Sequence, residues 1–175
     1  NGVILISTGQ NSGKHDGSLA QAAANLALLT GKIGKESSGV FVLGEKNNTQ
    51  GALDMGVAPG LLPGYADLKD PAERARFEKA WKMPLPDQPG MGALAILQGI
   101  EGGRIKGLYL AGENPAATYP DSSRTQKALA ALEFLVVQDC FLTETASLAH
   151  VVLPAATFAE KEGTFTNVDR RVQRV

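Results

Sequence analysis

Strand-like and helix-like segments alternate along this chain, and the alternation limits the folds that it can adopt. An apolar run over residues 3–7 precedes an alanine- and leucine-rich stretch, and strands are predicted again at 105–112, 133–139 and 149–154. Strands separated by helices favour right-handed crossovers and a parallel sheet. We therefore predict an α/β fold with a mostly parallel, twisted sheet and helices on both faces. The run at 3–7 is typical of a strand that is buried on both faces.

The first predicted helix has signals at both ends. Ser18 can cap its N-terminus with Gln21 three positions on, and Gly31 can terminate it. Helical spacing places four apolar residues on one face of this helix, which we expect to be the buried face. These residues are Leu19, Ala23, Leu26 and Leu29.

A long segment around 32–70 is rich in glycine, asparagine and proline, and we expect it to be irregular. A helix follows it, with Asp70 as cap, Pro71 at the first position and Glu73 completing a capping box. Phe77 and Trp81 lie on one face of that helix. Further helices are predicted at 91–103 and 122–132.

Composition limits the classes of partner and compartment. The net charge of the 175 residues is -1, so the chain lacks the excess of positive charge that is typical of nucleic-acid-binding proteins. No apolar run approaches the ~20 residues of a membrane span, so we expect no direct membrane insertion. The single Cys140 rules out an internal disulfide and fits a reducing, cytoplasmic location. We expect residues 1–175 to form a single α/β domain excised from a longer protein, since the chain starts without methionine.

The stretch "TGQNSGKHDG" at residues 8–17 looks like a nucleotide-binding P-loop but departs from it twice. Only three residues separate Gly9 from Gly13, where the P-loop needs four, and His15 follows Lys14 where a magnesium-binding hydroxyl belongs. The sequence therefore argues against an ATPase. Glycines at a strand-to-helix turn remain compatible with an anion near helix N–H groups.

Four segments leave the carboxyl ends of the predicted strands, where ligands bind in parallel sheets. We expect these segments to gather on one edge of the sheet: "TGQNSGKHDG", "GENPAATYPD", "QDCFLTETA" and "PAATFAEKEG". Gly112 permits a tight turn, while Asn114, Thr118, Gln138 and Asp139 offer groups that suit the N–H donors of guanine. The alternative, that these residues only form turns and helix caps, is equally open.

No complete catalytic set is evident in the sequence. We interpret His150 in an apolar strand as a hydrogen-bonded structural histidine, His15 as a solvated loop residue, and Cys140 as a small packing residue. Their scatter fits no metal site. Acid–base catalysis by a pair of carboxylates is an open alternative. Several carboxylates are predicted at the same edge of the sheet, but their spacing in the sequence does not identify a catalytic pair. These carboxylates are Glu113, Asp139, Glu144 and Glu160.

An ordered series of motifs resembles the molybdopterin oxidoreductase family through nearly the whole chain. It comprises "LALLTGKIGKESSGV", "NNTQGALDMG", "LPGY", "GENPAATYPD" and the closing "LEFLVVQDCFLTETASLAHVVLPAATFAEKEGTFTNVDRRVQR". The chain is similar in particular to the formate dehydrogenase alpha subunit and to the G-type subunit of NADH:quinone oxidoreductase.

The resemblance implies a Rossmann-like third domain that holds one molybdopterin guanine dinucleotide of a molybdenum or tungsten centre. Family iron–sulfur clusters and the metal-ligating residue lie upstream of this region. The expected partners are the remaining domains of the same subunit and other subunits of a respiratory or formate dehydrogenase complex. The family motifs match Asn114, Thr118 and Gln138 as cofactor contacts, with Asp139 and Thr143 in an adjoining motif. With Gly112 at the turn, the predicted cofactor-binding residues are Gly112, Asn114, Thr118, Gln138, Asp139 and Thr143.

Two departures from the family pattern affect the expected activity. Formate dehydrogenases carry an arginine where this chain has Gly44, which removes an electrostatic partner for a small anionic substrate. The second departure is His150, where many relatives have aspartate. We therefore favour the G-type subunit of NADH:quinone oxidoreductase over formate oxidation. A structural domain that has lost the pterin remains a further alternative.

Overall fold

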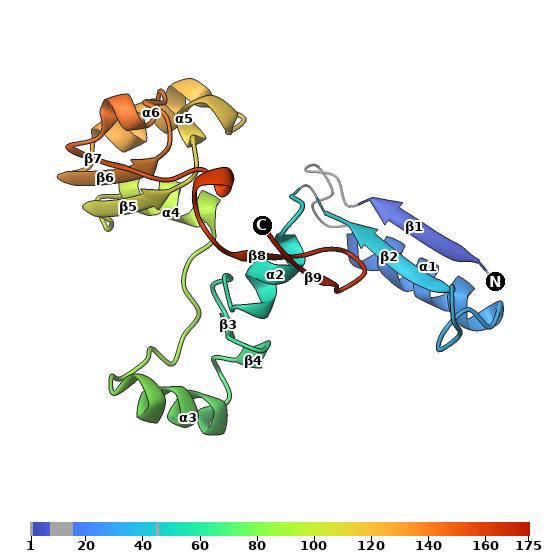
Figure 1. Cartoon of the computed structure of the whole chain (residues 1–175). Helices are drawn as coiled ribbons and strands as arrows, with labels where there is room; N and C mark the ends of the chain where they lie inside the picture. Colours follow the sequence, from blue (N-terminus) through green and yellow to red (C-terminus); the bar gives the residue numbers. More distant parts are fainter. Residues whose placement is uncertain (1, 8–15, 45) are drawn as a thin grey trace. The chain divides into compact units, whose positions relative to one another are not determined.

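The computed structural model describes residues 2–7, 16–44 and 46–175 (Figure 1). Contacts between Cα atoms divide the chain into two compact units. Unit 1 comprises Asn1–Asp87 and Gly163–Val175, and unit 2 comprises Gln88–Glu162. The single domain predicted for residues 1–175 stays a prediction, and each unit is described by itself.

Unit 1 begins with the predicted strand β1 (Val3–Ser7), which pairs in parallel with β2 (Gly39–Leu43). Helix α1 (Asp16–Leu29) connects the two strands and packs beside them (Figure 1). Of the strand β1, only Ile6 is buried, whereas Leu5 is 63% exposed. The expectation of burial on both faces is therefore wrong, because this sheet has two strands and α1 as its cover.

Of the four residues predicted for the buried face of helix α1, only Ala23 is buried, and the buried face also contains Ala27. The predicted residues Leu19, Leu26 and Leu29 are 46%, 50% and 87% exposed. Alanine at i and i+4 permits close approach of the helix to the strands. The helix begins at Asp16, so Ser18 lies inside its first turn and is not the cap.

The C-terminus of α1 is as predicted. Gly31 has φ +62°, and its N–H donates to the carbonyl oxygen of Leu28 at 3.0 Å. The N–H of Lys32 donates to the carbonyl oxygen of Ala27 at 2.7 Å. These two bonds form a Schellman motif, which requires the left-handed conformation that glycine adopts easily.

The segment around 32–70 is only partly irregular, which corrects that expectation in part. Its turns and loops connect β2, helix α2 (Thr49–Asp54) and the antiparallel pair β3 (Leu61–Leu62) and β4 (Ala66–Asp67). The distant hairpin β8 (Thr164–Thr166) and β9 (Val172–Arg174) belongs to the same unit. The Asn48 side-chain oxygen accepts a bond from the N–H of Thr166 at 2.9 Å, which fastens the hairpin to the start of α2.

Helix α3 (Pro71–Trp81) starts as predicted: the Asp70 carboxylate accepts from the N–H of Ala72 at 2.9 Å, and Pro71 is the first residue. Phe77 and Trp81 pack with ring centroids 5.1 Å apart. Glu73 forms an ion pair with Arg76 (2.6 Å) rather than the predicted capping box.

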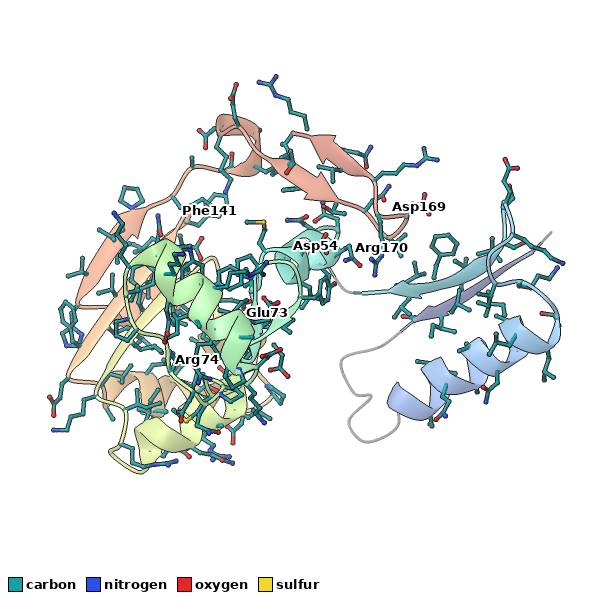
Figure 2. The ribbon with its side chains drawn as sticks, turned by 90° about the horizontal axis from the view of Figure 1, so that it is seen from below. Asp54, Glu73, Arg74, Phe141, Asp169 and Arg170 are labelled. Atoms are coloured by element: carbon teal, nitrogen blue, oxygen red, sulfur yellow. The ribbon has the colours of Figure 1, made fainter. Side chains whose placement is uncertain are left out.

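Figure 2 labels five side chains of unit 1, together with Phe141 of unit 2. Arg74 of α3 donates from Nη1 to the carbonyl oxygen of Leu68 at 3.2 Å, which ties α3 to the segment before it. Asp169 and Arg170 lie in the turn between β8 and β9, where Arg170 has φ +60°.

Unit 2 contains a three-stranded parallel sheet in the order β5 (Gly107–Ala111), β6 (Phe134–Asp139) and β7 (Val151–Pro154). All three strands occur where the sequence predicts them. The helices of this unit are α4 (Ala93–Glu101), α5 (Pro115–Thr118) and α6 (Ser122–Ala130), with 3-10 turns at Ala146–Leu148 and Phe158–Glu160.

The core of unit 2 forms where α4 and α6 meet the central strand. Leu129, Leu135 and Val137 are at most 1% exposed, and the alternation along β6 places Leu135 and Val137 on the same face. Ile100 of α4 and Ala116 of α5 belong to the same cluster of eight buried residues. Burial of the core side chains contributes roughly 1.5–3 kcal/mol for each large aliphatic residue.

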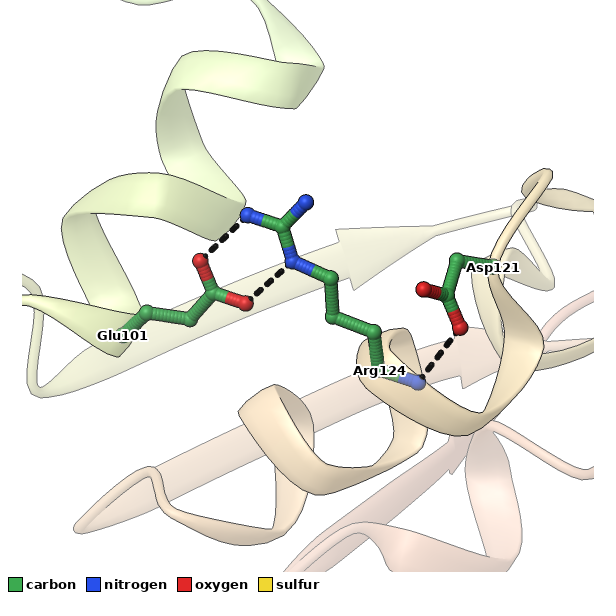
Figure 3. Close-up of polar contacts among 3 residues, drawn as sticks. All are labelled: Glu101, Asp121 and Arg124. Carbon is green, nitrogen blue, oxygen red and sulfur yellow. Dashed lines mark hydrogen bonds and ion pairs between the residues drawn. The ribbon is translucent and has the colours of Figure 1, made fainter.

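One ion pair links two helices at the surface of unit 2. Arg124 of α6 donates from Nε and Nη2 to the two carboxylate oxygens of Glu101 on α4, at 2.5 and 2.6 Å (Figure 3). The Asp121 carboxylate caps α6 by accepting from the N–H of Arg124 at 3.0 Å. The hydrogen bonds from Arg124 lower the pKa of Glu101.

Both parallel sheets confirm an α/β fold. Among residues 2–7, 16–44 and 46–175, no helix combines the length and the apolar character that crossing a bilayer requires.

Candidate functional site

Three of the four predicted loops leave the same edge of the unit 2 sheet. Strands β5, β6 and β7 are parallel and in register at their ends, with Ala111 opposite Gln138 and Asp139 opposite Pro154. Their carboxyl ends therefore meet at one edge, as predicted. The fourth loop, which contains Gly9, Gly13, Lys14 and His15, lies outside the described residues. It follows β1, which belongs to the separate sheet β1–β2, so the prediction of one shared sheet edge holds for three loops only.

A pocket of about 400 Å³ opens at this edge. Three of the predicted site residues, Gly112, Gln138 and Asp139, line it. The remaining lining residues come from the same strand ends and from the loop after β7: Ala111, Cys140, Ala155, Ala156, Thr157, Phe158 and Lys161. Cys140 is exposed here, so its interpretation as a packing residue is wrong.

Backbone geometry positions the polar groups of the pocket. Gly112 has φ +65°, and its N–H donates to the carbonyl oxygen of Gln138 at 2.9 Å, which turns the chain sharply after β5. The Asp139 carboxylate accepts from the N–H of Phe141 at 3.2 Å in an Asx-type turn. The hydroxyl of Tyr109 donates to the side-chain oxygen of Gln138, which holds that amide in one orientation.

Asn114, Thr118 and Thr143 do not line this pocket, and each has an internal hydrogen bond. The hydroxyl of Thr118 donates to the carbonyl oxygen of Asn114 at 3.0 Å. The hydroxyl oxygen of Thr143 accepts from the N–H of Ala146 at 3.1 Å. These local contacts are typical of turns and helix caps. They agree with the alternative stated above, in which these residues only stabilise turns and helix ends.

The side chain of Asn114 joins the loops after β5 and β6. Its oxygen accepts from the N–H of Thr145 at 3.1 Å and from the Thr145 hydroxyl at 2.7 Å. Its amide nitrogen donates to Glu144 at 2.7 Å, and this bond is the main cause of the lowered pKa of Glu144. The buried Thr145 hydroxyl also accepts from the N–H of Ala116 at 3.0 Å.

Several of these residues were not predicted from the sequence. Thr145 is fully buried, and its contact with Asn114 joins residues 31 positions apart, which no local spacing reveals. Phe158 and Lys161 lie in a loop that was expected at this edge, and an aromatic residue with a lysine three positions on was the available signal.

His150 is a structural residue, as predicted. Its Nδ1 accepts from the N–H of Leu135 at 3.0 Å, and its backbone N–H donates to the carbonyl oxygen of Leu135 at 2.9 Å. Within the described ranges, no group of three or more His, Cys, Asp or Glu residues has the geometry of a metal site. Of the carboxylates expected at this edge, only Asp139 lines the pocket.

Unit 1 has a separate pocket of about 460 Å³ at the end of β2. Gly44, Lys46, Thr49 and Gln50 line it together with Thr166 of β8. Gly44 thus lies in a pocket.

A family profile and individual relatives both match this chain over most of its length. The profile of the family described as molybdopterin oxidoreductase matches residues 1–175. An F420-dependent formate dehydrogenase subunit alpha of Methanocaldococcus jannaschii is 49% identical over 174 residues, which cover 98% of this chain and 25% of the relative. A G-type subunit of the NADH-quinone oxidoreductase of Rhizobium meliloti is 46% identical over 149 residues, which cover 85% of this chain and 17% of the relative.

A third relative has a different printed activity. An NADPH-Fe(3+) oxidoreductase subunit alpha of Geobacter sulfurreducens is 46% identical over 153 residues, which cover 87% of this chain and 18% of the relative. This chain therefore spans a quarter or less of the length of each of these three relatives.

Proposed function

Since this chain belongs to the molybdopterin oxidoreductase family, we propose that it binds a molybdopterin guanine dinucleotide at the pocket beyond β5, β6 and β7. The observation that carries the proposal is the placement of Gly112, Gln138 and Asp139 around one pocket at the carboxyl edge of a parallel sheet. Such a cofactor, when bound, supplies the metal centre at which the parent enzyme exchanges electrons with its substrate.

The residues of the pocket fit the guanine end of this cofactor. Guanine presents N–H donors at N1 and N2, and the Asp139 carboxylate is an acceptor for both. A volume of about 400 Å³ lies within the usual range for small-molecule sites. The pocket therefore accommodates a nucleoside, while the rest of the dinucleotide requires other surfaces of the parent protein.

The contacts proposed for Asn114, Thr118 and Thr143 are compatible with their internal bonds. Asn114 uses one amide N–H for Glu144, and within the described residues its second N–H is free for a ligand. The hydroxyls of Thr118 and Thr143 each retain bonding capacity beyond the bond that they make. We propose that these three residues contact the cofactor outside the pocket.

For the parent protein, we propose a G-type subunit of an NADH:quinone oxidoreductase, with iron–sulfur clusters upstream and a cytoplasmic location. A formate dehydrogenase alpha subunit is the alternative, and relatives of both names match this chain at similar identity. Gly44 favours the first, because glycine supplies no cation at that position, and Lys46 is the one basic side chain among the described residues that line the unit 1 pocket. A structural domain without pterin is the second alternative.

The proposed arrangement is one Rossmann-like domain that packs against the rest of its own subunit and against other subunits. Large apolar side chains that are exposed in this chain support it, including Leu29 (87%), Leu142 (75%) and Phe141 (70%). Apolar surface of this kind marks contact with other protein surfaces.

Metal and pterin analysis of the purified full-length protein tests the proposal. We expect molybdenum or tungsten together with molybdopterin guanine dinucleotide. If the protein contains neither metal nor pterin, the structural alternative replaces cofactor binding.

A matched pair of variants tests the site itself. Asp139→Asn keeps the shape of the side chain but removes the charge that guanine N–H groups need, so we expect about tenfold weaker retention of the pterin. Asp169→Asn, in the β8–β9 turn, is the control and should retain the pterin like the wild type. Equal pterin content in both variants would contradict the assignment of Asp139.

A further inference from the structure

The loop after β7 adds an aromatic ring and a cation to the pocket, and neither has a role in the contacts described above. Both Phe158 and Lys161 line the pocket with Gln138 and Asp139. We infer that Phe158 stacks on the guanine base and that Lys161 binds a phosphate of the same nucleotide. This inference rests on the proposed function and names the groups that select the ligand.

Phe158 has the exposure and the position that a stacking residue needs. It is 64% exposed although it is large and apolar, and it lies at the wall of a pocket rather than in the core. Aromatic rings bind bases by stacking on their faces, and exposed aromatic residues in nucleotide sites serve this purpose. A ring at this wall therefore gains a partner when a base enters the pocket.

Hydrogen bonds within the 3-10 turn Phe158–Glu160 fix its conformation. Oε2 of Glu160 accepts from the N–H of Thr157 at 2.8 Å and from the Thr157 hydroxyl at 2.9 Å. These bonds lower the pKa of Glu160, so its carboxylate remains charged and bound at the cap. The capping box thus presents Phe158 on a defined turn, and Glu160 itself does not line the pocket.

The charges that line the pocket match the polarity of a guanine nucleotide. Among the described residues, Asp139 and Lys161 are its only charged lining side chains, and no ion pair joins them. A carboxylate accepts from guanine N1–H and N2–H, while an ammonium group binds phosphate. Adenine presents an acceptor at N1, so the same carboxylate would disfavour it. The lining therefore predicts preference for guanine and for a phosphorylated ligand.

Titration of the 175-residue chain with guanosine, GDP and ADP by isothermal calorimetry separates these contributions. Phe158→Leu keeps apolar volume but removes the ring, so affinity for guanosine and for GDP should fall about tenfold, whereas Phe158→Tyr should retain it. Lys161→Gln should weaken GDP binding by about three- to tenfold and leave guanosine unchanged. ADP should bind more weakly than GDP to the wild type.

Lys127→Gln is the control for a loss of surface charge, because Lys127 lies on α6 and lines a different pocket. It should bind GDP like the wild type. If the wild type binds GDP but neither Phe158→Leu nor Lys161→Gln changes the affinity, the inference is overturned and the proposed function stands. Absence of any GDP binding by the wild type at millimolar concentration also overturns it, while pterin analysis of the full-length protein decides the proposed function separately.

Discussion

At the scale of single residues, the buried hydroxyl of Thr145 connects the loops that follow β5 and β6. It accepts from the N–H of Ala116 and donates to the side-chain oxygen of Asn114, and both Thr145 and Ala116 are fully buried. Thr145→Val keeps the shape but leaves the Ala116 N–H without an acceptor. We expect a loss of about 1–3 kcal/mol in the free energy of unfolding, measured by urea denaturation.

Thr118→Val provides the matched control for that measurement. Thr118 is exposed, and its hydroxyl bonds only to the carbonyl oxygen four residues earlier among the described contacts. We expect a change within about 0.5 kcal/mol. Equal effects of the two substitutions would show that the buried hydroxyl has no special role.

The carboxylate of Glu144 should report on the Asn114 side chain through its titration. The amide of Asn114 is the first cause of the lowered pKa of Glu144. Asn114→Ala should therefore raise this pKa toward its ordinary value of 4.5, as followed by carboxyl carbon chemical shifts in NMR. The stabilisation that the bond provides is present above the unfolded-state pKa and is lost as pH falls through the lowered folded-state pKa. An unchanged titration midpoint would contradict the hydrogen bond.

The sequence predicted the positions of residues whose place depends on local geometry, while their cofactor contacts stay predictions. Gly112 follows β5 and Asp139 ends β6, and strand ends can be recognised from an apolar run and a turn residue. Thr145 could not be found in this way, because its bonding partners come from another loop. The order of strands and helices thus predicts that the loops after β5, β6 and β7 lie at one edge of the sheet. It does not predict which side chains of these loops form hydrogen bonds with one another.

At the scale of elements, helix α1 buries small apolar side chains and exposes large ones. Ala27 is 0% exposed and Leu29 is 87% exposed. Ala27→Leu should cost about 1–3 kcal/mol in the free energy of unfolding, because extra volume must be forced between the helix and the strands. Leu29→Ala should change it by less than about 0.5 kcal/mol. Urea denaturation measures both, and a larger loss in Leu29→Ala would reverse the assignment of the buried face.

The predicted and the observed faces of α1 show why periodicity alone was insufficient. Leucines and alanines both recur at helical spacing in this stretch, and hydrophobicity favours the leucine row. The structure buries the alanine row because small side chains let a helix approach a two-stranded sheet closely. Strand β2 was missed for a related reason, since its parallel pairing with β1 is non-local and its flanks are rich in glycine.

The contact between α4 and α6 predicts a pH dependence of stability. Arg124 lowers the pKa of Glu101, so the pair stabilises the folded state above the ordinary glutamate pKa of 4.5. This stabilisation is lost as pH falls through the lowered folded-state pKa. Glu101→Gln should therefore lower the urea midpoint at pH 7 and have a smaller effect at pH 3. A difference that does not change with pH would contradict a charge-based contribution.

At the scale of the whole molecule, the chain contains two units with different connectivity. Unit 2 is continuous from Gln88 to Glu162, whereas unit 1 combines two separate segments. The core cluster of eight buried residues around Leu129 and Leu135 lies wholly within unit 2. Its parallel sheet, its helices and the candidate pocket also lie within these limits.

These observations predict that residues 88–162 fold without the rest of the chain. Their core, their sheet and the Asn114–Thr145 bonds all come from within the segment, so separation should remove none of them. The fragment should give a cooperative urea transition and dispersed amide signals in NMR, although a unit of this size is stable by only a few kcal/mol. Thr145→Val in the fragment should lower the urea midpoint, as we expect for the full chain. A fragment with undispersed amide signals and no cooperative transition would show that the unit 2 core depends on unit 1 for its stability.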